Sequence, residues 1–494
     1  MTRARQVRVA LLTLVACLAS APGVSAADGP QPCRITGIKN EVQCGKVLRP
    51  LDPARPDGPR IEVHYVVVPA MARRKLPDPV VLLAGGPGQS AIAVAPATMG
   101  LFARLNNRRD IVFVDQRGTG RSAPLECEDT RHSPLSEIGD LERQVARVLE
   151  CKTKLVALSH VRQESELRFF TTSLAMQDLE AVRLQLGAPQ LNLVGGSYGT
   201  RAALEYMRQY PQAVRRAVLD GVAPPDMHLA TSVSPDSQAA LDALLASCAE
   251  EPVCAKSFPR LADDWKALLA SLPKPAMVVH PLNGQRESLM LTRELLMGLV
   301  RGPLYAPALA SALPAAITEA AQGRYEALGG LAALLGTRRA TQMAMGMHFS
   351  VVCAEDLPPA GASLEAPGAD FGRDFERLYE RVCAQWPRGA VPERFTEVPK
   401  FPRAVLLLSG GLDPVTPPRH GERVAQALGA SAQHVIVPNA GHGVMAIGCT
   451  RDVVFRFIDA PGDKPVPPVD AACVRPIPRP LAFMPLAGGK DVPK

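Results

Sequence analysis

The sequence lacks the short motifs that mark many cofactor-dependent enzymes. It contains no P-loop with its Lys-Ser/Thr ending, no dinucleotide fingerprint in a strand-to-helix turn and no H-E-x-x-H. It also has no C-x2-C pair and no histidines gathered beside its cysteines, so a structural zinc site is not expected. No cofactor or metal is therefore predicted, and hydrolytic chemistry needs neither.

The net charge bears on nucleic-acid binding, and the chain length bears on the number of domains. The 494-residue chain has a formal net charge of +7, and its basic residues are scattered rather than gathered on a patch or stripe. This distribution gives no reason to predict a nucleic-acid partner. No internal repeat is visible, and the length exceeds the usual size of one domain. One core with an inserted lobe is the expected partition.

The first 26 residues have the pattern of an export signal. Three arginines (Arg3, Arg5 and Arg8) precede the apolar stretch Val9–Ala19, which is too short to span a bilayer as a mature helix. Val24-Ser25-Ala26 fits a small-residue cleavage site, so we expect an exported protein, periplasmic or secreted. A second route stays open, because Leu14-Val15-Ala16-Cys17 resembles a lipoprotein box that would anchor the chain through a lipid on Cys17.

The cysteine count agrees with export. Of the 11 cysteines, Cys17 lies in the signal segment, which leaves an even number for an oxidising compartment. The remaining cysteines fall into pairs that are close in sequence. We predict five local disulfides: Cys33 with Cys44, Cys127 with Cys151, Cys248 with Cys254, Cys353 with Cys383, and Cys449 with Cys473.

A serine stands inside G-x-S-x-G between an apolar run and a helical pattern. Leu191–Val194 is typical of a short buried strand, and the apolar residues of 201–210 recur at helical spacing. Strand, sharp turn and helix in this order predict a nucleophile elbow with Ser197 at its tip. Glycine is expected at 195 and 199 because a side chain there would collide with neighbouring backbone.

Two later segments supply the partners that a serine nucleophile needs. Asp413 follows the apolar run Ala404–Leu408, and His442 lies in a loop after the predicted strand His434–Val437. The order serine, acid, histidine predicts an α/β-hydrolase fold, with a mostly parallel central sheet and an inserted helical cap. His442 would accept the Ser197 proton and return it to the leaving group, while Asp413 would orient the imidazole.

The predicted strand 79–84 runs into a glycine-rich turn, 85–90. Such a turn exposes a backbone N–H toward the nucleophile, and the residue after the serine offers a second donor. We assign the oxyanion hole to Gly86 and Tyr198. A tight turn with no catalytic part is the alternative.

Taken together, these motifs resemble the prolyl aminopeptidase and tripeptidyl aminopeptidase group of serine exopeptidases. The resemblance runs from about Cys44 to Cys473 and rests on five segments: Gly85–Gly88, Asp115–Ser122, Gly195–Gly199, the Asp413 loop and Asn439–His442. It implies an α/β-hydrolase core, a helical cap inserted after the sixth strand, and hydrolysis at the N-terminus of peptides. Prolyl aminopeptidases commonly have a histidine where Ala84 stands, so the secreted tripeptidyl branch is the closer match.

The predicted domains follow from these motifs. They are an arm (27–44), the first part of the core (45–222), the cap (223–400), the second part of the core (401–473) and a Pro-rich tail (474–494). Within the cap, Ala- and Leu-rich segments with helical periodicity occupy 239–249, 261–272, 292–300 and 308–321. The cap should cover the carboxyl edge of the sheet and control access to Ser197.

Three motifs have competing interpretations. In Asp115–Ser122 we favour a structural role, in which aspartate and arginine pair with each other around a tight turn. Glu355 and Asp356 are candidates to bind the substrate ammonium, a role that the resemblance gives to an acidic cap residue; a solvated acid pair is the alternative. Met343–Met347 is expected to fill the core rather than to line an adaptable pocket.

The combined prediction is an exported serine exopeptidase that hydrolyses peptides through an acyl-enzyme. A carboxylesterase would use the same triad with a different pocket. A non-catalytic binding member of the fold is a third class, against which the complete set of Ser197, Asp413 and His442 argues.

Overall fold

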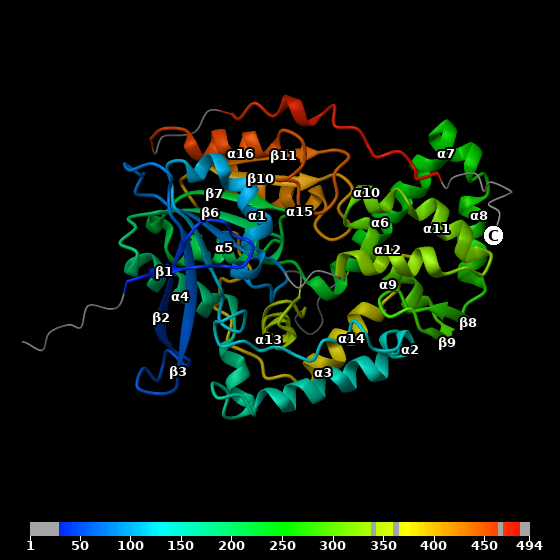
Figure 1. Cartoon of the computed structure of the whole chain (residues 1–494), viewed down its shortest axis with the longest axis horizontal. Helices are drawn as coiled ribbons and strands as arrows, with labels where there is room; N and C mark the ends of the chain where they lie inside the picture. Colours follow the sequence, from blue (N-terminus) through cyan, green and yellow to red (C-terminus); the bar gives the residue numbers. More distant parts are fainter. Residues whose placement is uncertain (1–28, 337–341, 359–364, 463–467, 485–494) are drawn as a thin grey trace, which may run out of the picture.

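A nine-stranded sheet forms the centre of the molecule (Figure 1). The computed structural model describes residues 29–336, 342–358, 365–462 and 468–484. The predicted signal segment with Cys17 and residues 485–494 of the predicted tail lie outside these ranges. The strand order is β1-β2-β3-β5-β4-β6-β7-β10-β11. Their bounds are β1 Gln31–Cys33, β2 Val42–Pro50, β3 Arg60–Val68, β4 Val80–Leu83, β5 Ile111–Val114, β6 Leu191–Gly196, β7 Val214–Asp220, β10 Val405–Gly410 and β11 Ala432–Val437.

The sheet is mostly parallel, which confirms the predicted fold class. The β1–β2, β2–β3 and β3–β5 pairs are antiparallel, and every pair from β5 through β11 is parallel. All residues of β4 and β5 are buried, as expected of central parallel strands covered on both faces. Parallel strands place their carboxyl ends at one edge, where this class of fold forms its sites.

Helices cover both faces of the sheet. Alternate side chains of each strand point to opposite faces. Val80 and Leu82 pack in a cluster with α1 (Ala91–Asn106) and α16 (Thr450–Asp459). Val81 and Leu83 belong to a second cluster on the other face, with helices α4 (Thr172–Gln185), α5 (Tyr198–Gln209) and α15 (Pro418–Leu428).

The cap lies to one side of the sheet and has a hydrophobic core of its own (Figure 1). Its elements are α6 Leu229–Glu250, α7 Pro252–Ser257, α8 Leu261–Ala270, β8 Lys274–Val279, β9 Arg286–Leu291, α9 Arg293–Leu304, α10 Pro307–Ala310, α11 Leu313–Ala321 and α12 Glu326–Gly336. The antiparallel β8–β9 hairpin differs from the expected all-helical cap. Asn283-Gly284, with Gly284 at φ +72°, is the turn signal that predicts such a hairpin.

The last part of the predicted cap packs differently. The helices α13 (Met345–Glu355) and α14 (Asp374–Cys383) join the cluster on the α4 and α5 face of the sheet, not the cap core. Most of α13 is buried, so it has no polar face from which periodicity could assign its partner. Met347 lies fully within this cluster, in line with the expected core role of the Met-rich segment.

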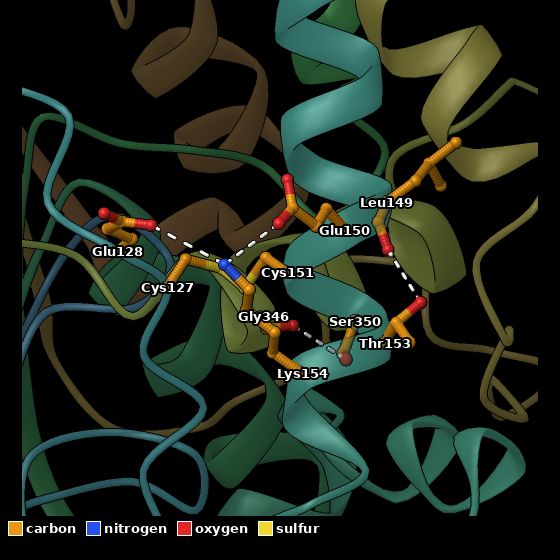
Figure 2. Close-up of a disulfide and its surroundings, with 9 residues drawn as sticks. All are labelled: Cys127, Glu128, Leu149, Glu150, Cys151, Thr153, Lys154, Gly346 and Ser350. Atoms are coloured by element: carbon orange, nitrogen blue, oxygen red, sulfur yellow. Dashed lines mark hydrogen bonds and ion pairs between the residues drawn. A yellow bond between two sulfur atoms is a disulfide. The ribbon is translucent and has the colours of Figure 1, made fainter. Parts of the chain in front are cut away.

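All five cysteine pairs are joined as predicted. The Cys127–Cys151 disulfide joins the loop after β5 to α3 (Leu141–Leu155). The short helix α2 (Leu135–Ile138) precedes α3 in the sequence. Figure 2 shows Lys154 of α3 between Glu128 and Glu150, with its Nζ 3.6 Å and 3.0 Å from their carboxylates.

The start of α13 lies against this region, because the Gly346 N–H donates to Leu125 O at 2.9 Å. A Cβ at Gly346 would lie 2.8 Å from that oxygen, so glycine permits the close approach.

The two chain ends of the described region are integrated into the fold. The predicted arm contributes β1, which pairs with β2 and is linked to it by Cys33–Cys44. The predicted tail runs from the core to the cap (Figure 1). Ile477 O accepts from Asn439 Nδ2 at 2.9 Å, and the Phe483 N–H donates to Ser311 O at 2.8 Å.

Residues 115–122 form a tight turn in which the Arg121 N–H donates to Asp115 Oδ2 at 3.0 Å, but the predicted pairing of aspartate and arginine side chains is wrong. Asp115 accepts hydrogen bonds from Ser90 Oγ and the Ile92 N–H at the start of α1. Arg117 instead donates to both carboxylate oxygens of Asp178 in α4, at 2.7 and 2.8 Å. The turn thus fastens a helix on each face of the sheet to the end of β5.

Candidate active site

Ser197 occupies a strained turn between β6 and α5. Its φ of +56° and ψ of −125° are unusual for a non-glycine residue. Its N–H donates to Asp220 O at the end of β7, at 2.9 Å. A Cβ at Gly195 would lie 2.4 Å from Gly199 O, and one at Gly199 would lie 2.0 Å from Leu83 O. The two glycines are therefore required sterically, for the reason expected from the sequence.

Asp413 and His442 meet at the carboxyl ends of β10 and β11. His442 Nδ1 lies 2.8 Å from Asp413 Oδ2, which leaves Nε2 as the nitrogen that can serve a nucleophile. The N–H groups of Val415 and Thr416 donate to Asp413 Oδ1, both at 2.9 Å. Thr416 Oγ1 donates to Asp413 Oδ2 at 2.8 Å and lies 3.1 Å from His442 Nδ1. Four contacts thus fix this buried carboxylate.

Asp413 and His442 shift each other's pKa in the directions that favour a charged pair. Burial alone would raise the pKa of Asp413, but His442 and the backbone donors lower it below its usual range. Burial would lower the pKa of His442, yet the charge of Asp413, helped by Asp220, raises it above its usual value. An imidazole with a raised pKa is a stronger base toward a serine hydroxyl.

Ser197 and His442 both lie at the end of β7. The Ser197 N–H bonds Asp220 O, and the next residue, Gly221, lies against the imidazole: a Cβ there would be 3.1 Å from His442 Cε1. Within the described ranges, the Ser197 hydroxyl makes no direct hydrogen bond to the imidazole. Such contacts are often long before substrate binds.

Two residues that the sequence did not reveal hold the loop that carries His442, residues 442–445, which we call the histidine loop. Tyr305, at the end of α9, accepts the His442 N–H at 2.9 Å, and its ring meets the imidazole edge-on at 5.3 Å between centroids. The carboxylate of Asp220 accepts the N–H groups of Val444 and Met445, at 2.8 and 2.9 Å. Asp220 is the last residue of the apolar strand β7, a position that could have marked it as a candidate.

Replacing Asp220 with asparagine should shift the acid limb of the pH profile of kcat/KM to lower pH. The Asp220 charge contributes to the raised pKa of His442, and its loss lowers that pKa. Neutral His442 then persists to lower pH, so activity survives further into acid. An amide also accepts through only one oxygen, so one loop bond is lost and kcat should fall by roughly tenfold.

Profiles of kcat/KM from pH 4 to 9 would measure this shift, with Asp452→Asn, at a half-exposed ion pair with Arg104, as the control. An unmoved acid limb in a folded Asp220→Asn protein would contradict a contribution of the Asp220 charge to the raised pKa of His442.

The glycine-rich turn lies directly against the nucleophile. A Cβ at Gly85 would come within 3.2 Å of the Ser197 Cβ, and Gly86 has a φ of +114°. Tyr198 is the first residue of α5, so its N–H has no acceptor within the helix. His348 of α13 supports the turn, with Nδ1 3.1 Å from Pro87 O and Nε2 2.7 Å from the Tyr379 hydroxyl. The oxyanion role of Gly86 and Tyr198 stays a prediction.

Glu355 and Asp356 lie at the end of α13 and are buried. Glu355 accepts from the N–H and Oγ1 of Thr172, at 2.7 and 2.6 Å, and burial raises its pKa to about 7. Asp356 forms an ion pair with Arg201, and the two side chains are 2% and 3% exposed. The ammonium-binding role stays a prediction, and each carboxylate has an internal partner already.

The described part of the chain holds no candidate metal site and no candidate membrane span. Residues 29–336, 342–358, 365–462 and 468–484 contain no group of three or more His, Cys, Asp or Glu side chains placed to hold a metal ion. In the same ranges, no helix combines the length and apolarity needed to cross a bilayer.

Comparison with known proteins gives the family. Residues 78–447 match the model of the alpha/beta hydrolase fold family. Serine protease Hip1 of Mycobacterium tuberculosis is 26% identical over 481 residues, covering 86% of this chain and 90% of that protein. Putative hydrolase YuaR of Escherichia coli is 23% identical over 460 residues, covering 85% and 87%. Tripeptidyl aminopeptidase of Streptomyces coelicolor is 29% identical over 202 residues, covering 38% and 36%. Since the family match spans well over half of its residues, the chain belongs to the α/β-hydrolase fold family.

Proposed function

We propose that this protein is an exported serine peptidase that cleaves peptides near a free N-terminus. The observation that carries the proposal is the hydrogen-bonded pair of His442 and Asp413 beside the strained serine of the β6–α5 turn. Support for peptide substrates comes from relatives named serine protease and tripeptidyl aminopeptidase.

The proposed reaction uses the chain's own groups throughout. Ser197 Oγ attacks the scissile carbonyl carbon while His442 Nε2 takes its proton, and Asp413 stabilises the imidazolium. The N–H groups of Gly86 and Tyr198 receive the developing oxyanion. His442 then gives the proton to the departing amine, which leaves an acyl-enzyme. Water, activated by the same imidazole, hydrolyses the ester and restores Ser197.

Export is supported by the five disulfides, which persist in oxidising compartments. The N-terminal signal remains a proposal from the sequence, and so does the alternative of lipid attachment at Cys17.

Matched chromogenic amides with free and acetylated N-termini test the proposal. We expect the free-amine forms of a one-residue or a three-residue substrate to be cleaved at least tenfold faster in kcat/KM than their acetylated forms, since the site would bind an ammonium by charge-assisted hydrogen bonds. Comparing the two lengths identifies the release of one or three residues. Equal rates on free and blocked amides would contradict N-terminal specificity, and turnover of short esters alone would favour a carboxylesterase.

A further inference from the structure

The cap places an arginine beside the candidate active site without an acidic partner. Arg301 lies in α9 one helical turn before Tyr305, the residue whose ring and carbonyl contact His442. Residues four apart in a helix lie on the same face. Among the described residues, no carboxylate lies within ion-pair distance of the Arg301 guanidinium.

This lack of a carboxylate partner distinguishes Arg301 from three well-buried arginines of the core. Arg109, Arg117 and Arg201 each meet an aspartate. A cation held away from bulk water without an anion is costly, which is why such groups are normally paired. Arg301 is half-buried, so part of its side chain is accessible.

Aromatic contacts hold the guanidinium and connect it to the other side of the site. Its Cζ lies 4.7 Å from the centroid of the Phe375 ring, within cation–π range. Phe375 packs on Tyr379 at 4.8 Å, and Tyr379 bonds His348, which in turn bonds Pro87 O in the glycine-rich turn. Arg301 therefore lies one helical turn from Tyr305, which contacts His442, and its Phe375 contact leads through Tyr379 and His348 to the predicted oxyanion turn.

The charge of Arg301 acts on the pKa of two neighbouring tyrosines, Tyr305 and Tyr379. Burial raises the pKa of Tyr305, and Arg301 acts in the opposite direction. The same two effects operate on the pKa of Tyr379, where burial again prevails. A guanidinium fixed on an aromatic plane in a partly dry site is a preorganised fork for a carboxylate.

We propose that Arg301 binds a carboxylate of the substrate and gives the enzyme a preference for acidic substrates. The inference rests on the proposed hydrolase site. The carboxylate has two sources, the C-terminal carboxylate of a short peptide or the side chain of an acidic residue. Both present the same planar anion to the guanidinium.

Three matched substrate pairs test the inference: a short peptide and its C-terminal amide, a Glu peptide and its Gln analogue with amidated ends, and a half-ester of a dicarboxylic acid and a neutral ester of equal length. For the wild-type protein, we expect the acidic member of at least one pair to have a kcat/KM roughly tenfold to a hundredfold higher. Arg301→Met should bring that ratio close to one, and Arg301→Lys should keep part of it. The peptide pair that responds identifies the source.

The matched control is Arg293→Met. Arg293 lies on the same helix, but its guanidinium donates to the carbonyls of Ala369 and Asp370, so the variant should keep the wild-type ratio. Ratios near one in the wild-type protein, or a ratio unchanged by Arg301→Met, would overturn the inference. The ester pair needs no peptide cleavage, so an acid preference there that depends on Arg301 would uphold the inference even if no peptide were hydrolysed.

Discussion

Ser197→Ala is expected to lower kcat by roughly 10³-fold or more while leaving the fold intact. The hydroxyl is the atom that would form the acyl-enzyme, and His442 and Asp413 act only through it. Because the groups of a triad work as a unit, removing the serine should cost about as much as removing the whole set. Alanine keeps the Cβ that already lies against Gly85, so the turn should not rearrange.

Steady-state kinetics on the best amide substrate would measure the loss, with a urea unfolding curve to show that the variant is folded. Ser271→Ala, at the C-terminal end of α8 in the cap, is the control and should keep wild-type kcat. A folded Ser197→Ala protein with wild-type turnover would remove Ser197 from the reaction.

Asp356→Asn is expected to destabilise the protein by about 3–5 kcal/mol. The substitution leaves the buried Arg201 guanidinium without its counter-charge, and Arg201 also donates to the carbonyls of Pro224 and Met227 at the entry to the cap. The midpoint of urea unfolding would report the loss. Asp226→Asn breaks a half-exposed pair with Arg423 and should cost no more than about 1 kcal/mol.

This variant also decides between two roles for the acidic pair. If Asp356 binds the substrate ammonium, Asp356→Asn should keep wild-type stability and lose kcat/KM on free-amine peptides but not on a neutral ester. If it is structural, stability falls, and peptide and ester turnover fall together. Glu355→Gln extends the comparison to a carboxyl whose hydrogen bonds come from Thr172 rather than from a cation.

The sequence was sufficient for the parts of the site that local backbone rules determine. Gly195 and Gly199 are dictated by collisions within one turn, and Asp413 and His442 follow strands whose apolar runs are unmistakable. The five cysteine pairs were predictable for a similar reason, since the two members of each pair are close in sequence.

Local backbone rules could not predict the contacts between segments that are far apart in the sequence. Asp115 and Arg117 look like partners in sequence, yet the end of β5 directs one to α1 and the other to Asp178 of α4. Tyr305 and Asp220 come to the histidine loop from two different elements, and no local pattern signals their convergence. The position of α13 within the inserted segment 223–400 predicts that it belongs to the cap, and its sequence has no polar face that would show which core it joins.

The most direct test of Ser197 as the nucleophile is peptide mapping after titration with a fluorophosphonate. We expect one phosphonyl group per chain, on the peptide that contains Ser197, with amide hydrolysis lost in proportion to labelling and no adduct on Ser197→Ala. Labelling at another residue, or full hydrolytic activity in a protein labelled completely at Ser197, would contradict it.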